Sequence, residues 1–170
     1  LAKAIDVSPM GALKIVKRLE KEEVLKAQRV GQATVYKINM KKDYAKRFVS
    51  LLLSRELLHA PGFVKRWVSE IKKIKHASVA ILFGSVLRKR EPSDVDVLLV
   101  TSESRFPKLE KEIKDLNKVN IKRIHPLYQS NEDVINNIKK RDKPLLNAIK
   151  GLIVFGEEEF LEIYDESRKE

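Results

Sequence analysis

Two short apolar runs around a polar loop constrain this chain more than any other feature. The runs SVAILF and VDVLLV cover residues 78–83 and 95–100, and both are typical of buried strands. A Gly-Ser pair ends the first run, and Asp94 and Asp96 enter the second. Because side chains alternate along a strand, the two carboxylates point to the same face. The pair predicts a metal site, since a divalent cation between two carboxylates offsets their repulsion.

Beyond residue 76, strand patterns alternate with helical ones. VNIKRIHPL (119–127) predicts a third strand and GLIVF (151–155) a fourth. Helices are expected from PKLEKEIKDLNK and from SNEDVINNIKK, where Ser130 and Asp133 form a capping box. The prediction is an α/β (α+β) fold, with a small mixed sheet flanked by helices over residues 76–170.

The first 42 residues form a separate basic module, with ten Lys and Arg against four Asp and Glu. Ser8 is the expected N-cap of a helix that starts at Pro9, and apolar residues follow at helical spacing. VLKAQRVGQATVYKI then predicts a hairpin with Gly31 in the turn. The order helix, helix, basic hairpin is that of a winged helix-turn-helix.

From LAKAIDVSP onward, this module resembles the winged helix-turn-helix domains of prokaryotic transcriptional regulators. The resemblance implies that the helix from Pro9 enters the major groove of DNA and that Arg29 lies on the wing. The residues expected to contact DNA are Ser8, Lys14, Lys17, Arg18, Lys21 and Arg29. A protein-binding or purely structural winged helix with a solvated basic face stays open. Leu1 is no initiator, and such domains have a helix ahead of this point, so a front piece is expected to be missing.

Residues 43–75 predict a helical bridge between the modules, broken at Pro61-Gly62. The stripes expected to be buried are Phe48, Leu51 and Leu52 in the first helix, and Val64, Trp67, Val68 and Ile71 in the second. These helices either pack on the C-terminal half or pair with a second chain as a homodimer. The predicted domains are therefore 1–42, 43–75 and 76–170.

Composition narrows the environment of the protein. No apolar run approaches the roughly 20 residues that cross a bilayer, and no signal peptide is recognisable, so a cytoplasmic protein without membrane contact is expected. There is no cysteine, and the three histidines are scattered, so any metal is expected to have oxygen ligands. The net charge of +11 suggests an anionic partner such as nucleic acid or nucleotide, although a heat-adapted surface is also rich in charge.

The Gly-Ser and Asp-x-Asp elements together resemble the minimal nucleotidyltransferases of the DNA polymerase beta type superfamily. The matching residues, in order, are Phe83, Gly84, Ser85, Arg88, Ser93, Asp94, Asp96 and the apolar run 97–100. The resemblance implies that Asp94 and Asp96 are catalytic and bind Mg²⁺ or Mn²⁺. It implies that NTP is bound by Gly84, Ser85, Arg88 and Ser93. The reaction would transfer NMP to an unknown acceptor, with pyrophosphate leaving.

Two departures from the family pattern bear on catalysis. The family places a third carboxylate on the next strand, and the matching position in VNI is Asn120, with Lys122 on the same strand face. Glu132 or Asp133 could supply the missing oxygen from a helix end. Only eight residues separate Ser85 from Asp94, and Lys89 replaces a glycine often found after the arginine. His125 is expected to pack or to cap rather than to act as an acid or base.

Three functional interpretations follow. The first is a nucleotidyltransferase joined to a DNA-binding winged helix. The second is a DNA-binding regulator whose degenerate transferase domain only binds nucleotide or a partner protein. The third is the antitoxin-like role of minimal nucleotidyltransferases, with a toxin-like protein as partner.

Overall fold

The computed structural model describes residues 2–169 and divides the chain into two compact units, Leu1–Val49 and Ser50–Glu170. Each is described by itself. Over the described residues, the chain has seven α-helices and two small sheets, which confirms a mixed α+β fold. None of these helices combines the length and apolar content needed to cross a membrane.

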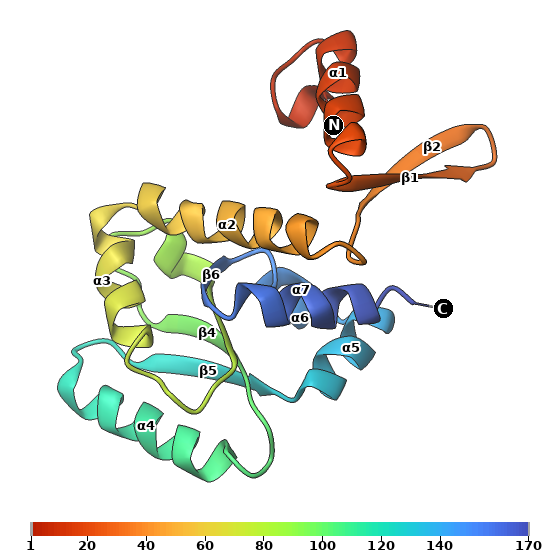
Figure 1. Cartoon of the computed structure of the whole chain (residues 1–170). Helices are drawn as coiled ribbons and strands as arrows, with labels where there is room; N and C mark the ends of the chain where they lie inside the picture. The colour runs from red at the N-terminus through yellow and green to blue at the C-terminus, as the bar shows by residue number, and fades with distance from the viewer. Residues whose placement is uncertain (1, 170) are drawn as a thin grey trace. The chain divides into compact units, whose positions relative to one another are not determined.

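The first unit contains a short helix, a longer helix and a hairpin (Figure 1). A 3₁₀ turn, η1 (Ala2–Ala4), precedes α1 (Pro9–Lys21), and the Ser8 hydroxyl accepts a hydrogen bond from Gly11 N at 3.0 Å. The hairpin pairs β1 (Leu25–Val30) with β2 (Ala33–Ile38) in antiparallel register, and Gly31 turns with a φ of 59°. The predicted helix start, its cap and the hairpin are confirmed.

The second unit takes in most of the predicted bridge. Helix α2 (Asp43–His59) begins in the first unit and ends in the second, and Pro61 separates it from α3 (Gly62–Ile71). The stripe predicted for α3 is confirmed, since its four members are buried. The stripe predicted for α2 is wrong at Leu51 and Leu52, which are exposed, while Phe48 is half-buried. Leu53 and Leu57 pack on the cores instead.

The sheet of the second unit has the order β5-β4-β3-β6 (Figure 1). Its strands are β3 (Val79–Phe83), β4 (Val95–Val100), β5 (Ile124–Gln129) and β6 (Leu152–Phe155). β3 is antiparallel to β4 and β6, whereas β4 and β5 are parallel. The two central strands are almost wholly buried, which explains why they read as continuous apolar runs.

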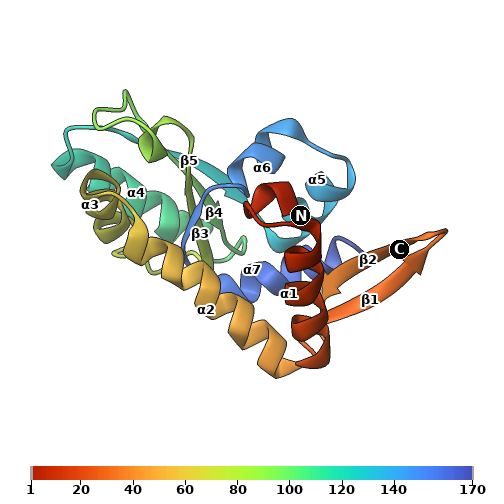
Figure 2. The ribbon, with the colours of Figure 1, turned by 90° about the horizontal axis from the view of Figure 1, so that it is seen from above.

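Helices cover both faces of this sheet, as Figures 1 and 2 show. Ala80 and Leu82 of β3 belong to a core shared with α3 and α4 (Phe106–Val119). Val79 and Ile81 belong to a second core with α5 (Asn131–Lys139), α6 (Lys143–Ala148) and α7 (Glu157–Glu166). Successive side chains of β3 therefore face different cores. Because β4 pairs with β3, the side chains of β4 alternate between the same two faces of the sheet.

The third predicted strand starts in the wrong place. Asn120 follows the last residue of α4 as its C-cap, and β5 begins only at Ile124. The start of β5 is held by Asn117, whose amide donates to the carbonyl of Ile124 at 3.1 Å and accepts from its N–H at 2.7 Å. The capping box of Ser130 and Asp133 is confirmed at the start of α5.

Candidate functional site

The strand register brings the Gly-Ser turn and the Asp-x-Asp pair to one end of the sheet. Phe83, the last residue of β3, pairs with Asp96, the second residue of β4. The chain leaves β3 through η2 (Gly84–Leu87), a 3₁₀ turn, and returns to β4 just after Asp94. Gly84 and Asp96, which are twelve apart in the sequence, therefore meet at this end of the sheet.

Gly84 is shaped to receive the carboxylate of Asp96. Its φ is +79°, and a Cβ built at this position would lie 2.3 Å from Asp96 Oδ2. Both the backbone conformation and the close approach exclude other residues. Because Gly84 has no side chain, Asp96 can lie directly against the turn.

Ser85, the residue after Gly84, carries an unsatisfied hydroxyl. In the part of the chain that the structure describes, its Oγ is buried and has no hydrogen-bond partner. Leaving a buried polar group unpaired costs about 1–3 kcal/mol. Such an orphan is a donor that an oxygen of a bound phosphate can satisfy.

The carboxylates of Asp94 and Asp96 repel each other. Burial raises the pKa of Asp96, and the negative charge of Asp94 raises it further, while His125 acts in the opposite direction. Asp94 itself accepts a hydrogen bond from the Ser93 hydroxyl at 3.1 Å. The protein thus leaves part of the negative charge of the pair uncompensated, which favours a bound cation.

His125 occupies the position on β5 that faces this pair. The parallel register places it beside Asp96, and its Nδ1 lies 3.7 Å from Asp94 Oδ2. Its side chain is 59% exposed, so the prediction that it packs or caps is wrong. Sequence reasoning missed its place because the predicted strand began too early.

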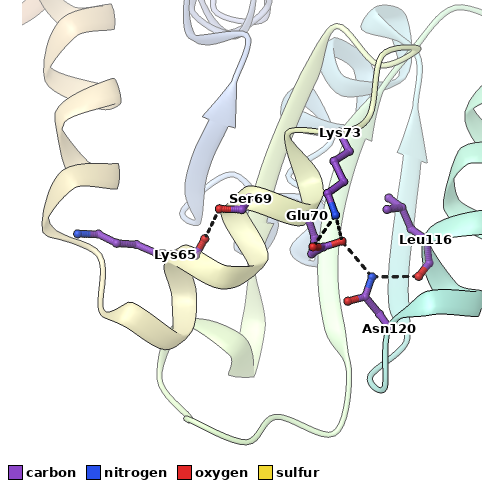
Figure 3. Close-up of polar contacts among 6 residues, drawn as sticks. All are labelled: Lys65, Ser69, Glu70, Lys73, Leu116 and Asn120. Atoms are coloured by element: carbon purple, nitrogen blue, oxygen red, sulfur yellow. Dashed lines mark hydrogen bonds and ion pairs between the residues drawn. The ribbon is translucent and has the colours of Figure 1, made fainter.

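Asn120 bonds to Glu70 and Leu116, as Figure 3 shows. Its Nδ2 donates to Glu70 Oε2 at 3.2 Å and to the carbonyl of Leu116 at 3.0 Å, which joins the end of α4 to α3. Asn120 is the C-cap of α4 and does not lie on the third strand, so the prediction that it occupies that strand is wrong. The residue of β5 that the register places beside Asp96 is His125.

The remaining phosphate and oxygen candidates are not part of this cluster. The side chain of Arg88 is exposed and, within residues 2–169, makes no hydrogen bond or ion pair. Asp133 is engaged with Ser130 beyond the far end of β5, and Glu132 is its neighbour. Because His125 is the second residue of β5 and Ser130 follows the strand, about 16 Å of extended chain separates the two places. Neither acid can complete the pair.

The donor set fits a magnesium ion only when substrate supplies further ligands. No group of three or more His, Asp or Glu side chains in the described residues is placed to hold a metal. Mg²⁺, however, is commonly held by one or two carboxylates together with phosphates of a bound nucleotide. Asp94 and Asp96 supply the two carboxylates for such a site.

The residues expected to contact DNA are confined to the first unit, and two of them are partly neutralised. Lys17 pairs with Glu20 at 2.8 Å, and Arg18 pairs with Glu22 at 2.9 Å. Lys14, Lys21 and Arg29 make no ion pair with another described residue. Ser8 caps α1, so its hydroxyl is used within the protein.

Comparison with protein-family models, with curated proteins and with solved structures finds no match to this chain.

Proposed function

We propose that the second unit is a nucleotidyltransferase-type domain that binds Mg-NTP at the mouth of β3 and β4. The observation that carries the proposal is the contact of Gly84 with the carboxylate of Asp96, together with the orphaned hydroxyl of Ser85, the next residue in the chain. The absence of a side chain at Gly84 leaves room for the carboxylate of Asp96 to lie against the turn, where it could share a Mg²⁺ ion with the phosphates of a nucleotide. The first unit would be a winged helix-turn-helix that binds DNA, for which its basic composition is the support.

Each residue of the site would have a distinct task in nucleotidyl transfer. Ser85 would donate its hydroxyl to a phosphate oxygen, and Asp94 and Asp96 would hold Mg²⁺. Bound Mg²⁺ would neutralise charge on the triphosphate. An acceptor oxygen would then form a bond to the α-phosphorus while the bond to pyrophosphate breaks. In this proposal His125 would take the place of the family's third carboxylate, which helps to activate the acceptor.

A second function is favoured by His125 itself. With an imidazole in place of the third carboxylate, the site keeps the groups that would bind Mg-NTP but lacks one that supports transfer. The protein would then be a DNA-binding regulator that responds to nucleotide. Both functions require the same nucleotide site, so binding is tested first and transfer second.

The binding test is calorimetric titration of Mg-ATP into the wild type and the Asp94→Asn, Asp96→Asn double variant. We expect binding to the wild type and none to the double variant, which should fold because the substitutions remove a repulsion. The control is Asp115→Asn, an exposed acid on α4 that pairs with Lys118. An unresponsive wild type, or binding that survives in the double variant, would refute the proposed site.

The transfer test separates the two functions. Label from [α-³²P]ATP incorporated by the wild type supports the transferase. If the wild type binds ATP but transfers nothing, and His125→Asp gains transfer, the regulator is supported. DNA binding is tested with Lys14→Glu and Lys21→Glu, which we expect to weaken it at low salt.

A further inference from the structure

The outer face of α2 in the second unit is an exposed leucine ridge. Leu51 is 67% and Leu58 is 71% exposed, and they lie two turns apart on the same side of the helix. The opposite side of α2 carries Leu53 and Leu57, which pack on the two cores. A helix that is apolar on both sides is normally covered on both.

The rotation of this half of α2 is fixed by contacts inside the unit. The Ser54 hydroxyl donates to the carbonyl of Ser50 at 2.9 Å and to Glu157 Oε1 of α7 at 2.8 Å. Together with the buried leucines, these bonds keep Leu51 and Leu58 outside. The ridge is therefore a permanent feature of the surface of this unit.

A groove runs beside the ridge. It is a cavity of about 620 Å³ between the end of α2, the start of α3, η2 and the segment before β6. Its apolar floor includes Val64, Leu87 and Leu152. A protruding ridge beside a hollow is the shape that a two-fold dimer needs, because the ridge of each chain can enter the groove of the other.

The groove carries charges of both signs, so the grooves of two copies can pair through opposite charges. Arg55, Lys150 and Glu56 all line it, and none makes an ion pair with another described residue. The negative charge of Glu56 would repel the phosphates of nucleic acid, and the leucines offer no group that binds phosphate. A second copy would offer Glu56 to the cations of the first, and the same pairing would recur across the two-fold axis.

We infer that this ridge and groove form a homodimer interface, with the α2 of each chain seated on the other. The inference does not rest on the proposed function, since no residue of the nucleotide site takes part. Because a net charge of +11 makes copies repel at long range, the dimer must be stabilised by these local contacts.

The experiment is sedimentation equilibrium of the whole chain at about 1–100 µM, a range in which an interface of ordinary size associates. We expect the wild type to be a dimer and Leu51→Lys with Leu58→Lys to be a monomer with unchanged circular dichroism. The matched control is Val119→Lys with Ile121→Lys, two residues that are even more exposed but lie at the end of α4 and after it. The control should remain a dimer.

A third variant tests the charges. Glu56→Lys should raise the dimer dissociation constant about tenfold, because it replaces an attraction with a repulsion. A monomeric wild type at the highest concentration overturns the inference. So does a dimer that survives both lysines on the ridge, or one that the control disrupts equally.

Discussion

Replacing Gly84 with alanine tests whether the turn is built around Asp96. The substitution adds a single methyl group at a position with a φ of +79°. That methyl would lie 2.3 Å from Asp96 Oδ2, well inside contact distance. Gly84→Ala is therefore expected both to strain the backbone and to displace the carboxylate of Asp96.

The expected cost can be worked from these two effects. A residue with a Cβ in the left-handed region costs about 1–2 kcal/mol. Asp96 has a short side chain that must leave its rotamer to make room, which costs about 0.5–1.5 kcal/mol. We therefore expect Gly84→Ala to lower the free energy of unfolding by about 1.5–3.5 kcal/mol and to abolish Mg-ATP binding.

The assay is urea unfolding followed by Trp67 fluorescence. Trp67 is the chain's one tryptophan, and it is buried in α3, so it reports on the second unit. The control is Gly62→Ala at the start of α3, where a Cβ meets no atom within 4 Å and the free energy should change by less than about 1 kcal/mol. A loss below about 1 kcal/mol for Gly84→Ala, with Mg-ATP still bound, would refute the reasoning.

Three further substitutions probe the second unit by urea unfolding. The pKa of Asp96 is raised in the folded state, so ionisation of its carboxyl lowers stability as pH rises from the unfolded-state pKa to the folded-state pKa. Asp96→Asn should therefore stabilise the metal-free protein more at about pH 7 than at about pH 4. Equal effects at the two pH values would contradict this. Glu112 accepts three hydrogen bonds, from Lys75 N, His76 N and His76 Nδ1, so Glu112→Ala should cost about 1.5–3 kcal/mol. Asn120→Asp replaces a hydrogen-bond donor to Glu70 with a second carboxylate and should lower the free energy of unfolding by about 1–2 kcal/mol. A gain of stability would exclude this contact.

Local patterns were enough to predict the central strands and the first helix. The strands around Leu82 and Leu98 are buried on both faces, so their apolar runs are continuous. Ser8 and Gly31 mark a cap and a turn whose geometry depends on neighbouring residues alone. Gly84 was correctly placed at a strand end, although its contact with Asp96 depends on the pairing of two strands and could not be predicted.

The errors arose where apolar residues are not buried. Ile121 is 88% exposed, and its apolar character made the loop after α4 look like the start of a strand. Leu51 misled in the same way, since its spacing predicts burial that this chain alone does not provide. Periodicity reports that a residue is apolar, but it does not report what covers it.

The choice between the two proposed functions now depends on one residue in β5 and on its register. Asn117 clamps Ile124, so the strand begins there and the next residue, His125, comes to lie beside Asp96. An acid at position 120 would meet Glu70, whereas an acid at position 125 would lie beside Asp94 and Asp96, the proposed metal ligands. Restoring catalysis at Asn120 is therefore not expected to succeed. His125→Asp is the substitution that can turn a nucleotide-binding site into a transferring one.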